Sequence, residues 1–257
     1  MKQANFNSNK RSLLATGAGL LLAAACLGGM AACSSTPMEM RPPAGFEGQS
    51  LTLPAANRSR ATGLLVDESF DLGAYRVTGI EGKNSSTGGS FQIGGLKVEN
   101  RRSAFSYHLV GGNSGRTDVA AQCASKSNET TLPVFSAVTL QRYKVNFSCD
   151  CRTQDGHSST LSIASDSGWQ GAAGSNPVRL SITLDEVEYP LGRFDANGRT
   201  VPDDEPFAGY RVDGPSGPVA ALGLSYPGTV WLHERLPAAK REVMSCALAG
   251  LMLHRGP

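Results

Sequence analysis

The sequence lacks the short motifs from which common catalytic and metal sites are built. It contains no Gly-x-Ser-x-Gly segment to expose a serine nucleophile, and none of its four histidines stands at His-Glu-x-x-His spacing. Cys149 and Cys151 are separated by one residue, so they do not form a Cys-x-x-Cys motif, and no second clustered pair with histidine follows them. The sequence therefore predicts no catalytic residue, no metal site and no cofactor.

An excess of basic residues is also missing. The formal net charge is +2, but Lys2, Lys10 and Arg11 stand in a leading segment without acids. From Cys33 onward, 21 basic residues face 22 acidic ones, which leaves a net charge near −1. Because nucleic-acid binding depends on a concentration of positive charge, we expect no nucleic acid among the partners.

A third absence, that of charge between Ser12 and Met38, points to export. Three cations followed by an apolar run are the pattern of a secretory signal peptide. The run ends at Met30-Ala31-Ala32-Cys33, followed by Ser34. These residues resemble the lipobox of bacterial lipoproteins, in which the cysteine receives a diacylglycerol and the preceding peptide bond is cut.

This resemblance implies a signal peptide over residues 1–32 and lipidation of Cys33, so that N-terminal acyl chains attach the protein to a membrane. Met30 departs from the usual leucine, which leaves Cys26 as an alternative acylation site. Because about 20 apolar residues can span a bilayer, a single uncleaved membrane helix is the alternative to a cleaved signal peptide. Ser34 resembles the outer-membrane sorting signal. We therefore expect a lipid-anchored protein of the cell envelope, at the outer membrane and facing the periplasm, or at the cell surface.

The sequence has four further cysteines, Cys123, Cys149, Cys151 and Cys246. Because we expect the protein to be exported to a compartment where disulfides persist, these cysteines are expected to form disulfide bonds. Cys149 and Cys151 lie two apart in a predicted strand, so they share one face and are poorly placed to pair with each other. A cross-strand bridge from Cys123 to one of them is favoured. The sequence leaves the complete pairing open.

Residues 33–60 are rich in proline and small polar residues, which predicts a flexible tether. Residues 61–257 are expected to form a single β-rich domain. Short runs of β-branched and aromatic residues, separated by turn residues, predict eleven strands and an all-β sandwich or barrel. The expected strands are Phe70–Ile80, Ser90–Val98, Ser103–Leu109, Asp118–Cys123, Val138–Cys149, Thr160–Ala164, Val178–Leu184, Val187–Phe194, Gly209–Val212, Val219–Leu224 and Thr229–Leu232.

One stretch indicates a helix. Pro237 opens it, and Val243–Leu253 is almost wholly apolar. A helix that is apolar on every side must be buried all round or lie in a membrane. Eleven residues rise only about 16 Å, which is too short to span a bilayer. The sequence therefore predicts a helix inside the protein core.

This last segment carries a resemblance to the tubby-like group, which includes the tubby C-terminal domain, the LURP-one proteins and the phospholipid scramblases. Its residues are Phe207–Val212, Val219–Leu224, Gly228–Leu232 and the helix to Leu253. The resemblance implies a closed or nearly closed antiparallel β-barrel of about eleven to twelve strands around a hydrophobic C-terminal helix. A β-sandwich with the helix packed on one face is the alternative.

The function expected from these features is that of a membrane-anchored, non-enzymatic binding or structural module, with lipid or an envelope protein as partner. The first alternative is a lipid-acting envelope enzyme with a site assembled from distant loops, in which His157 or His233 would meet an acid and a nucleophile. The second is a component of a surface assembly, for which a large exposed apolar patch is expected outside the core.

Overall fold

The computed structural model divides the chain into two units, residues 1–38 and 39–257. It describes residues 40–59, 68–82, 86–112, 117–135, 138–168, 178–202 and 205–254, all of them in the second unit. The expected signal peptide, Cys26 and Cys33 lie outside the described residues.

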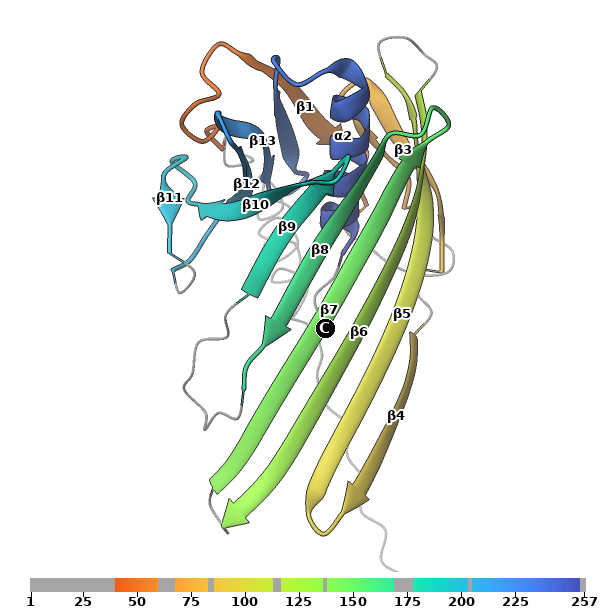
Figure 1. Cartoon of the computed structure of the whole chain (residues 1–257), viewed down its shortest axis with the longest axis vertical. Helices are drawn as coiled ribbons and strands as arrows, with labels where there is room; N and C mark the ends of the chain where they lie inside the picture. The colour runs from red at the N-terminus through yellow and green to blue at the C-terminus, as the bar shows by residue number, and fades with distance from the viewer. Residues whose placement is uncertain are drawn as a thin grey trace, which may run out of the picture. The chain divides into compact units, whose positions relative to one another are not determined.

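The described residues form fourteen strands and one helix (Figure 1). Their bounds are β1 Ser50–Ala56, β2 Phe70–Leu72, β3 Tyr75–Glu81, β4 Ser86–Ile93, β5 Leu96–Gly111, β6 Thr117–Phe135, β7 Val138–Thr153, β8 Ser158–Asp166, β9 Val178–Leu184, β10 Val187–Phe194, β11 Thr200–Val201, β12 Gly209–Gly214, β13 Gly217–Gly223, β14 Thr229–His233 and α2 Ala238–Leu253.

Twelve of the strands close into an antiparallel barrel. The order around the wall is β10-β12-β13-β14-β1-β2-β3-β5-β6-β7-β8-β9, and β9 pairs with β10 to complete the circle. Strand β4 is added beside β5, and β11 beside β10. The structure thus has the predicted mainly-β fold and the predicted barrel.

The beginning of the barrel differs from the sequence prediction. The expected tether reached residue 60, whereas β1 starts at Ser50 and pairs with both β14 and β2. Leu53 and Ala55 point into the core from this strand. Pro54 stands between them and its carbonyl accepts a hydrogen bond from the Gly73 N–H, so this proline lies within the barrel wall. In this segment the alternation of apolar residues, which favours a strand, outweighs the proline-rich composition, which favours a tether.

Helix α2 lies inside the barrel, where every residue from Val243 to Leu253 is buried. Its backbone carbonyls are bound by polar groups of the wall. The Ser159 hydroxyl donates to the Val243 carbonyl at 2.7 Å, and the Tyr107 hydroxyl donates to the Cys246 carbonyl at 2.6 Å. The prediction of a helix buried on all sides is confirmed. No helix in the described residues has the length and apolarity to cross a membrane.

Two disulfide bonds strengthen the wall and its attachment to the helix. Cys123 of β6 pairs with Cys149 of the adjacent strand β7, as the predicted cross-strand bridge requires. Cys151, two residues further along the same inner face, pairs with Cys246 of α2. The helix is therefore joined covalently to β7.

Candidate functional site

A groove crosses the outer face of strands β5, β6, β7 and β8. The face is defined by alternation: Phe105, Cys123, Cys149 and Leu161 are partners across these strands and pack into the core. Side chains one residue away on each strand must point outward. They are small, and they form the row Ala104, Ala124, Ser148 and Ser162.

The groove has a volume of about 990 Å³. A second row of outward-pointing side chains lies two residues away from the first on each strand, and the backbone between the two rows forms the floor of the groove. No acidic side chain contributes to the lining, which consists of Thr87, Arg102, Ser103, Ala104, Ala124, Ser125, Lys126, Asn146, Phe147, Ser148, Ser162, Ile163 and Ala164.

The second outer row brings four hydrogen-bond donors into line. Thr87 of β4 is the partner of Arg102, Arg102 of Lys126, and Lys126 of Asn146. With strands about 4.8 Å apart, the row extends over about 14 Å. We name it the donor row. It presents two positive charges and two neutral donors at one edge of the groove.

Arg102 and Lys126 are like charges placed directly opposite each other. In the part of the chain that the structure describes, neither side chain makes an ion pair or a hydrogen bond. Like charges in this position destabilise a sheet, by about 0.2–1 kcal/mol for a typical pair. An anion bound in the groove would remove this repulsion.

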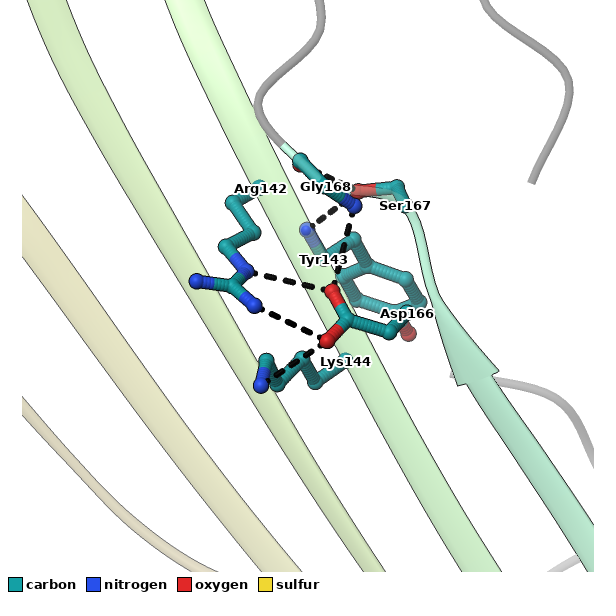
Figure 2. Close-up of polar contacts among 6 residues, drawn as sticks. All are labelled: Arg142, Tyr143, Lys144, Asp166, Ser167 and Gly168. Atoms are coloured by element: carbon teal, nitrogen blue, oxygen red, sulfur yellow. Dashed lines mark hydrogen bonds and ion pairs between the residues drawn. The ribbon is translucent and has the colours of Figure 1, made fainter. Parts of the chain in front are cut away.

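The same face shows how the sheet neutralises cations elsewhere (Figure 2). Asp166, at the end of β8, accepts hydrogen bonds from Arg142 at 2.9 and 3.1 Å and lies 2.8 Å from the Lys144 ammonium. The Arg142 guanidinium, followed by Lys144, holds the pKa of Asp166 well below its usual range. Arg142 and Lys144 are thus already paired through Asp166, whereas Arg102 and Lys126 of the donor row have no such carboxylate partner in the described residues.

The opposite edge of the groove is acidic. A second cavity, of about 540 Å³, shares Ala104, Ala124 and Ser148 with the first and includes Glu81 and Asp150. One oxygen of Asp150 accepts a hydrogen bond from the Thr160 hydroxyl at 2.6 Å. The two cavities therefore form one surface with a basic end and an acidic end.

A smaller polar cavity, of about 250 Å³, lies on the inner face of the same strands, beyond the end of α2. It is lined by Glu99, Arg101, Ser127, Glu129 and Tyr143. The Lys97 ammonium, 2.5 Å from Glu99, lowers the pKa of that carboxyl, whereas burial, together with nearby Glu129, raises the pKa of Tyr143. Because a general acid at neutral pH needs a raised carboxyl pKa, Glu99 is unsuited to that role.

The histidines of the enzyme alternative do not meet a nucleophile among the described residues. His157 Nδ1 lies 3.3 Å from Asp185 Oδ2. Burial opposes ionisation of Asp185, but the Ser158 N–H, His157 and nearby Lys240 outweigh it and lower the pKa. Ser158 thus contributes its backbone N–H to this carboxylate.

His233 is buried, and its Nδ1 accepts a hydrogen bond from the Arg235 N–H at 3.2 Å. Among the residues that the structure describes, no acidic side chain bonds to this imidazole. Within the same residues, no group of three or more His, Cys, Asp or Glu side chains is placed to hold a metal ion.

Sequence reasoning missed the groove entirely. The basic residues that form it stand in different strands, at Arg102 and Lys126, and only the pairing register brings them together. The signal available was the alternation within each strand, which places Arg102 and Lys126 on the face opposite to the core cysteine Cys123. Comparisons of the chain with protein-family models, curated proteins and solved structures find no match.

Proposed function

We propose that the chain is a lipoprotein of the cell envelope, anchored through acylated Cys33, and that its barrel is a non-enzymatic binding module. The groove on β5–β8 is the binding surface of this module. The observation that carries the proposal is that the outer wall has a groove with an unneutralised donor row, while α2, buried from Val243 to Leu253, occupies the barrel core.

The chemistry of the donor row selects for a negatively charged ligand. Arg102 and Lys126 supply the charge, and Thr87 and Asn146 supply neutral donors on either side. Charge-assisted hydrogen bonds to an oxyanion are about twice as strong as neutral ones. The small alanine and serine side chains of the neighbouring row leave space for the uncharged part of such a ligand.

The anchoring half of the proposal is tested by intact mass and membrane fractionation of the native protein beside Cys33→Ser. The native form should lack residues 1–32, carry acyl mass and fractionate with membranes, whereas the variant should not be acylated. If both forms carry acyl mass and fractionate alike, the acylation site is Cys26 and not Cys33. If neither form is acylated and both stay with membranes, the anchor is an uncleaved helix.

The binding half is tested by thermal unfolding in increasing inorganic phosphate, sulfate or citrate at constant ionic strength. A ligand that binds only the folded state raises the unfolding midpoint in proportion to the logarithm of its concentration. We expect this rise in the native protein and its loss in the double variant Arg102→Gln, Lys126→Gln. The matched control is Arg152→Gln, an exposed arginine outside the groove lining, which should keep the response. Equal responses in all three proteins would refute anion binding at the donor row.

A further inference from the structure

The strands β4 to β7 continue beyond the barrel core and end in two hairpin turns. Helix α2 ends where His254 stacks on Phe147, with ring centroids 4.1 Å apart. Strand β7 extends seven residues further, to Leu140, and pairs there with Leu132 of β6. At about 3.3 Å per residue, this is about 23 Å of sheet beyond the helix. The turn between β4 and β5 lies at the same end (Figure 1).

The outer face of this end is apolar. Ile93 pairs with Leu96 across the first turn, and Leu132 with Leu140 across the second. Phe91 and its partner Val98 follow in the next outward-facing row. We name these six side chains the tip patch. Among the described residues, Ile93 at 72% and Phe91 at 51% are the most exposed large apolar side chains.

The inner face of the same strands is polar, so the sheet end is amphipathic. Gln92, Lys97, Thr131 and Gln141 are successive partners across β4, β5, β6 and β7. Glu99 and Arg101 follow on β5. Only the outer face therefore has an apolar surface without cover in the described residues, and a solvated monomer has no need of one.

The charge of this sheet end is also distinctive. The segments 86–103, 125–135, 138–148 and 162–168 contain six basic residues and three acidic ones, a net charge of +3, whereas the chain from Cys33 onward has a net charge near −1. The basic residues are Lys97, Arg101, Arg102, Lys126, Arg142 and Lys144. Basic residues beside exposed apolar side chains are the combination that binds the surface of an anionic bilayer.

A protein partner fits this surface less well. A specific protein interface takes roughly 20–30 residues from each side, and the tip patch has six. Insertion into lipid has no such size requirement, because each apolar side chain gains from leaving water on its own. We therefore propose that the tip patch inserts into an anionic lipid surface, as a membrane contact separate from the acyl anchor and from the groove. This proposal rests on the proposed function in one respect, namely that the lipid anchor keeps the tip patch near a bilayer.

The test uses the full lipidated chain with a tryptophan at the tip, Ile93→Trp, reconstituted into vesicles whose lipids carry brominated acyl chains. In vesicles containing phosphatidylglycerol, we expect the emission of the new tryptophan, after subtraction of the native signal, to shift to the blue and to be quenched. Quenching should be weaker in pure phosphatidylcholine. Glu188→Trp, an exposed position on β10, is the matched control and should remain unquenched.

A second substitution keeps the proposal falsifiable. Leu132→Asp in the Ile93→Trp chain should lower the docking equilibrium about ten- to hundredfold, because one buried leucine is lost from the lipid contact. Gln154→Asp adds the same single negative charge in the exposed turn that follows β7, at the other end of that strand, and should leave the equilibrium unchanged. Intact mass reports acylation separately, so failure of the anchor and failure of the tip are distinguishable.

Two results would overturn the proposal. One is an Ile93→Trp emission that is unquenched by brominated lipid and fully open to acrylamide, which would leave the tip in water. The other is protection from both quenchers that depends on protein concentration, which would assign the tip patch to a second copy of the chain.

Discussion

Replacement of Gly250 by alanine in helix α2 sets two effects of known size against each other. Alanine is about 0.8–1.0 kcal/mol more favourable than glycine inside a helix, so helix propensity alone predicts a more stable protein. In this barrel, however, a Cβ at position 250 would lie 2.8 Å from Cys149 Sγ and 2.9 Å from Tyr107 Oη. Real Cβ atoms essentially never approach other atoms so closely.

Neither neighbour can move away easily. Cys149 Sγ is bonded to Cys123, and Tyr107 Oη is held by its hydrogen bond to the Cys246 carbonyl. Overpacking of a core costs about 1–3 kcal/mol, which exceeds the gain in propensity. Gly250→Ala should therefore lower the free energy of unfolding by about 1 kcal/mol, measured by urea denaturation under non-reducing conditions.

A double-mutant cycle with Tyr107→Phe isolates the cause. Removing the hydroxyl relieves one of the two close contacts, so Gly250→Ala should cost less in the Tyr107→Phe protein than in the native one. If Gly250→Ala instead stabilises the protein by about 1 kcal/mol, α2 does not approach the wall as closely as described, and the explanation for glycine at this position fails.

Three further predictions concern the same barrel. Arg58→Met should lower the free energy of unfolding by about 1.5–3 kcal/mol in urea denaturation, because the Arg58 guanidinium donates hydrogen bonds to the Met252 and Pro227 carbonyls. The control Arg76→Met breaks only an exposed ion pair with Asp71 and should lower it by less than about 1 kcal/mol. Equal losses would contradict a special role for Arg58. Burial lowers the pKa of His254 below 6.5, so the unfolded chain binds a proton at this imidazole more readily than the folded chain does. The free energy of unfolding should therefore fall as the pH drops below about 6.5, and His254→Phe should reduce this dependence when denaturation is measured at several pH values. An unchanged pH dependence in the variant would contradict the role of His254. Removing the Cys151–Cys246 bridge should cost about 4.7 kcal/mol and removing Cys123–Cys149 about 3.5, since their sequence separations are 95 and 26 residues; the reverse order would reject a chain-entropy origin.

The sequence was most informative where periodicity and composition agree. The run Val243–Leu253 is apolar on all sides, and only a buried helix satisfies it. Alternation places Cys149 and Cys151 on one face, and the structure uses both in separate disulfides. These are local properties, which a single segment displays without knowledge of its neighbours.

Strand boundaries were less predictable, because turns and long hairpins depend on pairing. The run Ser90–Val98 was expected as one strand, but it contains the turn between β4 and β5, at Gly94 and Gly95. Strand β6 extends over 19 residues, from Thr117 to Phe135, where composition suggested only Asp118–Cys123. The polar stretch between Ala124 and Thr131 is held in a strand by β5 and β7 on either side.

The groove could not be predicted for a related reason. Arg102 and Lys126 are 24 positions apart, and the sequence shows each only as an ordinary surface cation. Their meeting depends on the register between β5 and β6, which the long hairpin determines. The lipid anchor differs from the groove because its signal lies within one continuous segment, residues 1–34, and does not depend on strand pairing. It stays a prediction.

The position of α2 has a consequence for the order of events during synthesis. Every wall strand precedes the helix in the chain, yet the wall has its apolar side chains directed toward that helix. A nascent chain that ends before residue 238 would possess all fourteen strands and have nothing to close around. Completion of the barrel must therefore wait until the last segment has been made, and truncated products would expose an empty, apolar interior to proteases and chaperones.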